Sequence, residues 1–392
     1  MALFQEADGD PRVALDRLAD VLSYYGAVGD AAAGLAFGFS LRKAAFARSI
    51  AEALEVEATV LDAVAIAGLV HAVGALGNPA LVRESDLPER LATMERWDIP
   101  AAGARVCAAI GAIPERVADI VRWQAEAWDG TGFPDQLRWN GIPVPSVALA
   151  LADRVVRAHE PEEALASIAE EAGRSFAPAH SRAFMLWFHR SGAEVEAFTF
   201  PRSALLAEFS DPGDMLLDIA DRIDRHLGVP GRARNVLRLS EASARALGCS
   251  APEIEALRIA ALTFGAGELG DSFESTLDPL VRLGLERRAE RAQAGARLIE
   301  GLPTLAAAAP LVAARAEWFD GTGKPAGLAR DVIPIGARIL ATAIAYDAID
   351  IDTRARPAAR RATAGERLDG AAGTHFDPRV VTAVLEAAKA HA

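Results

Sequence analysis

Two aspartates in glycine-rich loops are the residues of this chain whose type and spacing most suggest chemistry. Asp129 lies in Trp128–Pro134, which reads WDGTGFP, and Asp320 lies in Phe319–Pro325, which reads FDGTGKP. A carboxylate in such a loop can serve a polar site, or it can accept hydrogen bonds from backbone amides in a tight turn that glycines permit. We favour the structural role for both loops.

The two loops recur at a fixed separation along the chain. An Ile-Pro pair follows each of them, at Ile142-Pro143 and Ile333-Pro334. The two pairs are separated by the same number of residues as the two aspartates. Equal spacing of this kind indicates an internal duplication. A chain of 392 residues is also longer than a single hydrophobic core usually grows. We therefore predict two tandem domains, residues 1–200 and 201–392.

The elements that must position these loops are helices. Apolar residues recur at helical spacing in several segments, whereas long alternating runs of Val and Thr are absent. Representative apolar stripes are Leu15-Leu18-Leu22, Ala44-Ala47-Ile50-Leu54 and Leu216-Ile219-Ile223-Leu227. Prolines stand near the expected ends of the helices. The sequence therefore predicts an all-α fold in which one glycine-rich loop interrupts the helices of each domain.

Both halves of the chain resemble HD-GYP domains along nearly their whole length. That family has a His-Asp-x-Gly-Lys segment on a helix, a HHE-x-x-DG-x-GYP segment, an Ile-Pro pair and an Ala-Asp-x-Phe-Asp-Ala helix. The two Asp-Gly-Thr-Gly loops and their Ile-Pro pairs carry the resemblance here. It implies an all-helical fold and a centre of two or three iron ions that hydrolyses cyclic dinucleotides, chiefly cyclic di-GMP. Such a centre needs several converging imidazoles and carboxylates.

The resemblance implies that the first domain keeps part of this site. His71 matches the histidine of the His-Asp doublet and Asp153 matches a downstream metal ligand, so these two are the candidate metal ligands. Glu126, which matches the glutamate of the HHE segment, and Asp129 in the loop are the candidate catalytic residues. Other family positions carry different side chains, namely Ser40, Ala72, Ala75, Ile99, Gln124 and Ala125. We favour a core role for His71, because a single histidine on an apolar helix is more often a packed residue than a ligand.

The second domain keeps none of the family's metal ligands. The residues at those positions are Ala233, Phe264, Gly265, Glu268, Arg291, Arg315, Ala316 and Ile344. Because Phe264 and Ile344 are apolar and would face the same metal, we expect core side chains to fill the cavity there. Arg315, Lys324 and Arg338 are candidate ligand-binding residues, since their charges could contact the phosphate oxygens of an anion. For Lys324 and Arg338 we favour solvated surface charge.

The composition argues against several classes of partner. The net charge of −13 and the pI near 5.1 disfavour a broad nucleic-acid surface, which needs clustered Lys and Arg. Cys107 and Cys249 have no nearby Cys or His spacing, so neither a disulfide framework nor a zinc knuckle is expected. The acidic first residues differ from a signal peptide, and no apolar stretch is long enough to span a bilayer. We expect a cytoplasmic protein that binds neither membranes nor nucleic acid.

The loss of family ligands in both domains leads to two functional hypotheses. The first is a catalytically degenerate regulatory or scaffold protein that binds a partner protein or a nucleotide-like ligand and needs no cofactor. The alternative is a metal-dependent phosphohydrolase of the cyclic dinucleotide phosphodiesterase type with a reduced site in the first domain. His71 and Asp153 would then hold iron or manganese, with Glu126 or Gln124 assisting. We favour the first hypothesis, because every missing ligand weakens the case for metal catalysis.

Overall fold

The computed structural model describes residues 11–77, 98–109, 115–191, 194–195, 211–269, 284–355 and 363–390. They form two compact units. The N-terminal unit is Leu15–Pro212, and the C-terminal unit contains Gly213–Ala392. The predicted boundary between residues 200 and 201 lies outside the described residues and stays a prediction.

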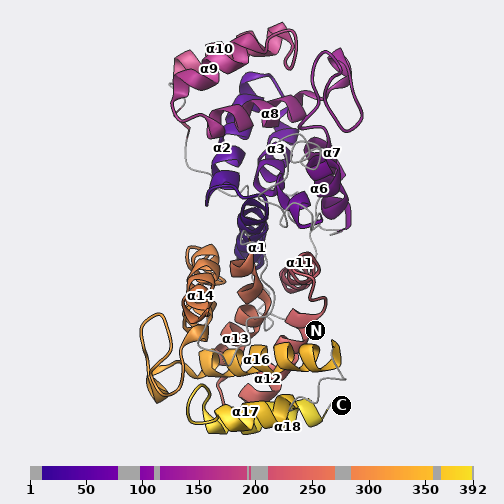
Figure 1. Ribbon diagram of the computed structural model, residues 1–392. Helices are drawn as coiled ribbons and strands as arrows, with labels where there is room; N and C mark the ends of the chain where they lie inside the picture. The colour runs from indigo at the N-terminus through magenta and orange to yellow at the C-terminus, as the bar shows by residue number, and fades with distance from the viewer. Residues whose placement is uncertain are drawn as a thin grey trace. The chain divides into compact units, whose positions relative to one another are not determined.

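Helices build both units, and the described residues contain no strand beyond isolated bridges. The all-α prediction is therefore confirmed. The first series of helices (Figure 1) is α1 (Pro11–Ala32), α2 (Phe39–Ala53), α3 (Ala58–Val70), α6 (Asp98–Ala109), α7 (Glu115–Arg122), α8 (Val144–Arg157), α9 (Pro161–Glu170) and α10 (Pro178–Ser191). Two short 3-10 helices, η1 (Val73–Gly77) and η2 (Trp139–Gly141), lie between them in the chain.

The second series of helices follows in a similar order along the chain. It consists of α11 (Pro212–His226), α12 (Arg232–Ala246), α13 (Ala251–Thr263), α14 (Leu285–Glu300), α15 (Ala309–Ala313), α16 (Ile335–Ala355), α17 (Ala364–Ala371) and α18 (Pro378–Lys389). Four 3-10 helices accompany them: η4 (Phe264–Glu268), η5 (Ala306–Ala308), η6 (Ala314–Ala316) and η7 (Arg330–Val332). An origin of the two series by duplication stays a prediction from the sequence.

Local sequence sets several helix ends. Gly38 precedes α2 with a φ of 77° and Gly231 precedes α12 with a φ of 84°, a conformation that glycine adopts without steric cost. The α8 helix carries Pro145 in its first turn, where a missing backbone N–H costs nothing. Thr363 and Glu366 form a reciprocal capping box at the start of α17.

The core of the N-terminal unit lies where α2 packs against α3 and α8. The α3 helix is buried along most of its length, as its run of Ala, Val, Ile and Leu requires. Gly68 allows α3 to approach α2 closely, because a Cβ there would lie 2.6 Å from the Cα of Ala44. Because α2 also packs directly against α8, side chains of these two helices can meet.

A helix that spans a bilayer must be both long enough and apolar enough. Within the described residues, none meets both requirements.

Candidate active site

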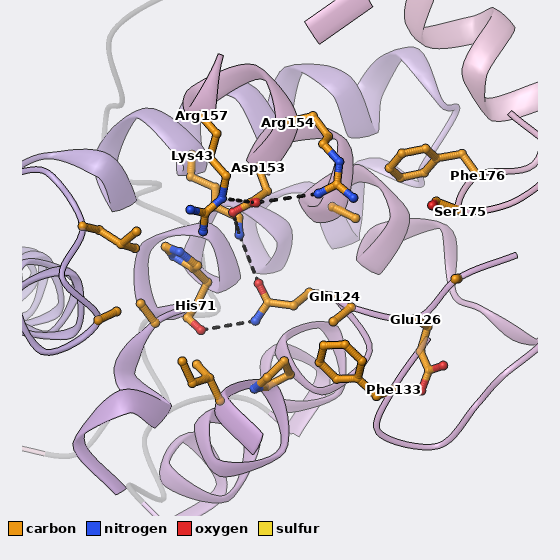
Figure 2. A pocket seen from close by; sticks show the side chains of 18 of the residues that line it. Lys43, His71, Gln124, Glu126, Phe133, Asp153, Arg154, Arg157, Ser175 and Phe176 are labelled. Carbon is orange, nitrogen blue, oxygen red and sulfur yellow. Dashed lines mark hydrogen bonds and ion pairs between the residues drawn. The ribbon is translucent and has the colours of Figure 1, made fainter. Parts of the chain in front are cut away.

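A cavity of about 450 Å³ opens in the N-terminal unit. Its walls come from the loop before α2, from α2 and α8, and from the residues that follow α3 and α7 (Figure 2). His71, Glu126 and Asp153 line it, although they are far apart in the sequence. The structure therefore brings together three of the four site residues predicted for the first domain, whereas Asp129 does not line the cavity.

Asp153 on α8 is surrounded by cations. Its Oδ1 accepts a hydrogen bond from Lys43 Nζ at 2.9 Å, and its Oδ2 accepts one from Arg157 Nε at 2.6 Å. Arg154 lies 3.9 Å from the same carboxylate and also pairs with Glu171 at 3.0 Å. Burial raises the pKa of Asp153, but Lys43 and Arg157 outweigh burial and hold that pKa well below its ordinary value. We refer to Lys43, Arg154 and Arg157 as the cationic cluster.

Lys43 is the buried member of the cationic cluster, with 2% of its side chain exposed. Its Nζ also donates to Gln124 Oε1 at 3.1 Å, and Gln124 Nε2 donates to the backbone carbonyls of His71 and Val121. Burial lowers the pKa of Lys43, and the neighbouring Asp153 opposes that shift. A buried ammonium needs such partners to offset the loss of water.

His71 directly follows α3 and packs near the ring of Phe39, with the two ring centroids 5.6 Å apart. Its Nδ1 lies 3.0 Å from the carbonyl oxygen of Gly68. Burial and then the charge of Lys43 lower the pKa of His71 well below its ordinary value, so the ring is neutral. When Nδ1 donates to Gly68, Nε2 carries a lone pair. That Nε2 is buried and has no hydrogen-bond partner among the described residues, so the His71 side chain beside the cavity holds an unused acceptor.

The two predicted catalytic carboxylates hold the glycine-rich loop instead. Glu126 accepts hydrogen bonds from the backbone N–H groups of Asp135 at 2.6 Å and Leu137 at 2.9 Å. Asp129 accepts from the backbone N–H of Thr131 at 2.9 Å and from its hydroxyl at 2.6 Å. Figure 2 shows Glu126 beside this loop and apart from the cationic cluster. The capping contact predicted for Asp129 is confirmed.

The residues of the cavity do not fit the metal centre that the HD-GYP resemblance implies. No group of three or more His, Cys, Asp or Glu side chains suited to a metal ion occurs in the described part of the chain. Asp153 is engaged by Lys43 and Arg157, and Glu126 is engaged by backbone amides. A protein metal site needs several ligands that converge on one point. His71 and Asp153 share a cavity, but they do not form such a site.

The sequence profile of the HD domain family matches residues 31–179 and 216–380, which is most of the chain. The chain belongs to the HD domain family. The resemblance to HD-GYP domains predicted this membership, and the two matched segments lie one in each unit.

Two curated relatives of this HD domain protein come from Vibrio cholerae. A cyclic di-GMP phosphodiesterase is 38% identical over 81 residues, which cover 21% of this chain and 16% of that protein. The protein named 3'3'-cGAMP-specific phosphodiesterase 3 is 26% identical over 291 residues, which cover 70% of this chain and 63% of that protein. The chain therefore spans less than two thirds of either relative.

A solved structure shares the fold of this HD domain protein. It is the crystal structure of the cyclic GMP-AMP specific phosphodiesterase V-cGAP3 of V. cholerae, with a TM-score of 0.65 and 19% sequence identity. The match covers 95% of this chain and 97% of that chain.

The favoured hypothesis of a degenerate, non-catalytic regulatory or scaffold protein is wrong. Both relatives and the matching structure are named phosphodiesterases, which supports the alternative hypothesis instead. The physical reason for the error is that the hypothesis counted only metal-ligand positions. It overlooked Lys43 and Arg157, which supply positive charge to the cavity from positions outside the family's ligand set.

The matching region of the C-terminal unit of this HD domain protein is closed. Phe264, at the position that matches His71, is 1% exposed. The guanidinium groups of Arg232 and Arg315 lie 4.9 and 5.7 Å from its ring centroid. Glu268 pairs with both arginines, at 2.9 and 3.8 Å. A space of only about 60 Å³ is left beside Arg315 and the half-buried Ile344. Phe264 is buried as predicted, but a network of charged side chains fills the region with it.

The three basic residues predicted to hold an anion are not brought to one cavity. Arg338 is buried and lies 2.7 Å from both Asp331 and Asp377. The surface-charge interpretation is therefore wrong for Arg338, because the fold buries this side chain and pairs it with the buried Asp377 and the exposed Asp331. Lys324, whose side chain is 45% exposed, lies 3.5 Å from a glutamate. Arg338 and Arg315 are thus each paired with carboxylates of the chain itself.

Sequence reasoning missed the cationic cluster. Helical spacing was the available signal, since Lys43 stands four residues before Ala47 on the predicted apolar stripe and Arg157 stands four residues after Asp153. A lysine on the buried face of a helix is rare unless it is paired. The partner of Lys43 lies on α8, however, and only the tertiary structure identifies it.

Proposed function

We propose that this HD domain protein binds a cyclic dinucleotide in the cavity of its N-terminal unit and hydrolyses a phosphodiester bond of that ligand. One observation carries the proposal: the cationic cluster and His71, whose buried Nε2 has no partner among the described residues, line the same cavity. The names of the relatives, phosphodiesterases for cyclic di-GMP and 3'3'-cGAMP, support the class of substrate.

Charge and size suit an anionic nucleotide. The side chains that line the cavity include three cations, Lys43, Arg154 and Arg157, against the two carboxylates Glu126 and Asp153, which leaves one net positive charge. Ligand cavities usually measure roughly 300–1,000 Å³, and the cavity of about 450 Å³ lies within that range. Phe133 and Phe176 also line it, and aromatic rings are favourable surfaces for nucleobases.

Hydrolysis adds water to phosphorus and breaks the bond from phosphorus to one ribose oxygen. Negative charge grows on the phosphoryl oxygens, and fixed cations such as Lys43 and Arg157 stabilise that charge in a water-poor site. The attacking water must lose a proton, and we assign that proton to His71, which lines the cavity and whose buried Nε2 must become accessible when the ligand binds. The released ribose oxygen gains a proton, which completes the reaction.

The test is turnover of cyclic di-GMP and of 3'3'-cGAMP by the full chain, with linear products separated by liquid chromatography. Reactions run in EDTA, in Mn²⁺ and in Fe²⁺, so that the metal dependence of any turnover is measured directly. We expect His71→Gln to lower the rate by about 100-fold, because a positioned proton acceptor contributes roughly 10²–10⁴-fold. His159→Ala is the matched control, since His159 is exposed and outside the cavity.

Absence of turnover for both nucleotides in all three conditions would contradict the proposal. Equal rates for the unaltered chain and a folded His71→Gln variant would remove His71 from the reaction. Circular dichroism establishes whether the His71→Gln variant is folded.

A further inference from the structure

We infer, on the basis of the proposed function, that the Lys43 ammonium takes the place of a bound cation, so that the cavity receives the phosphate of its ligand without a metal ion. Lys43 Nζ is held by Asp153 Oδ1 at 2.9 Å and by Gln124 Oε1 at 3.1 Å. Both of these residues stand at sequence positions that match metal ligands of the HD-GYP pattern.

The ammonium and a metal ion exclude each other at this point. A transition metal would approach a carboxylate oxygen to about 2.0–2.2 Å. Lys43 Nζ already donates a hydrogen bond to Oδ1 of Asp153. Arg157 Nε donates a hydrogen bond to Oδ2 of the same carboxylate at 2.6 Å. Both oxygens of Asp153 are therefore satisfied by cationic side chains of the protein itself.

The family's own lysine is not the source of this charge. Its position is Ala75, which is fully buried and apolar. Lys43 instead enters from α2, where 2% of its side chain is exposed. The charge is fixed in place before any ligand arrives, as electrostatic recognition of a phosphate requires.

One donor of Lys43 remains for a ligand. A protonated lysine has three N–H groups, and the described partners of Nζ are Asp153 and Gln124. Arg157 is 49% exposed at its side chain and donates to Asp153 through Nε, which leaves its terminal nitrogens for the same phosphate. A phosphodiester carries two unesterified oxygens, which one lysine and one arginine can contact together.

Calorimetric titration of the full chain tests the inference with cyclic di-GMP and 3'3'-cGAMP as probes. Each titration is run in EDTA and again in Mn²⁺, and the metal content of the protein is measured by mass spectrometry. We expect the dissociation constant to agree within about twofold in the two conditions, because the protein supplies the cations. Lys43→Met should weaken binding roughly tenfold or more, since it removes a charged hydrogen-bond donor.

Arg48→Met is the matched control, because Arg48 lies on the same helix but is half-exposed and outside the cavity. It should leave the dissociation constant unchanged. Arg157→Met is a second variant, needed in case Lys43→Met does not fold, and it should also weaken binding by several-fold.

Binding that appears only when Mn²⁺ is added, together with one or more metal ions per chain, would overturn the inference and leave the proposed function intact. Unchanged affinity in folded Lys43→Met or in Arg157→Met would also overturn it. Absence of binding to both nucleotides in both conditions would overturn the proposed function itself.

Discussion

The two units of this HD domain protein use the same scaffold around two different interiors. In both, a buried glutamate accepts two backbone N–H groups of the glycine-rich loop: Glu126 at 2.6 and 2.9 Å, and Glu317 at 2.7 and 3.1 Å. The aspartate of each loop caps the following threonine in the same way. The hydrogen bonds of the two loops are therefore alike, although the side chains inside the two units differ.

The interiors differ at matched positions. The pairs are Lys43 and Val236, His71 and Phe264, and Asp153 and Ile344. The N-terminal unit keeps a cavity of about 450 Å³ beside its three polar residues, whereas a space of about 60 Å³ remains in the C-terminal unit, where Phe264 packs with a buried ion network. The comparison teaches that the repeated glycine-rich loop indicates a shared fold. Whether a unit has a cavity depends on the side chains that its helices carry.

The buried ion network of the C-terminal unit should give the largest effect on stability. Glu268→Gln removes the carboxylate that pairs with both Arg232 and Arg315 and leaves Arg232 with the more distant charges of Asp224 and Asp347, so we expect the free energy of unfolding to fall by about 4 kcal/mol. Glu171→Gln is the control in the N-terminal unit, where the partner Arg154 is 36% exposed, and it should cost about 1 kcal/mol or less. Urea denaturation measures both, and equal losses would contradict the contrast between the two interiors.

The two loops should respond alike to the same change. A Cβ at Gly132 would lie 2.1 Å from the backbone nitrogen of Ala127, and one at Gly323 would lie 2.0 Å from that of Trp318. We expect Gly132→Ala and Gly323→Ala each to cost about 3 kcal/mol in thermal or urea unfolding. Gly370→Ala, which meets open space, should be neutral or slightly stabilising. Strongly unequal losses at the two loops would show that the scaffolds differ.

A buried aspartate in each unit should make stability depend on pH. Burial raises the pKa of Asp224 to about 7 and that of Asp30 to about 6, against the hydrogen bonds that each accepts. The folded state therefore binds the proton more tightly, and stability falls as pH rises from about 4 towards these values. Asp224→Asn should be more stable than the unaltered chain at pH 8, by on the order of 2 kcal/mol, and equal near pH 4.

Asp30→Asn should show the same sign with a smaller difference, complete by about pH 6. Denaturation midpoints measured from pH 4 to pH 8 would decide both cases. An advantage of either variant that grows as the pH falls would contradict the expected sign.

The smallest effect should come from two exposed residues with left-handed backbones, each of which begins a short 3-10 helix. Trp139 has a φ of 54° and Arg330 a φ of 53°, and both are exposed. Glycine relieves the strain of this conformation but loses more chain entropy on folding. We expect Trp139→Gly and Arg330→Gly each to raise the free energy of unfolding by about 0.5 kcal/mol in urea denaturation. If one substitution raises the free energy of unfolding and the other lowers it, one of the two side chains has a packing role.

The sequence by itself determined the helical fold and the two loop motifs. Apolar stripes at helical spacing predict helices because each stripe must be buried against another element. The glycines of each loop predict a tight turn for local steric reasons, and the apolar Phe264 and Ile344 predict a filled interior in the C-terminal unit. All of these properties depend on residue type or on neighbours close in the sequence.

Only the tertiary structure decided which charges meet. Lys43, Gln124 and Asp153 come from three separate segments, and their contacts at 2.9 and 3.1 Å follow from the way α2 packs against α8. The same holds for Arg338, whose burial depends on carboxylates at Asp331 and Asp377. An ion pair forms where packing brings two side chains together, and spacing along the chain does not encode that distance.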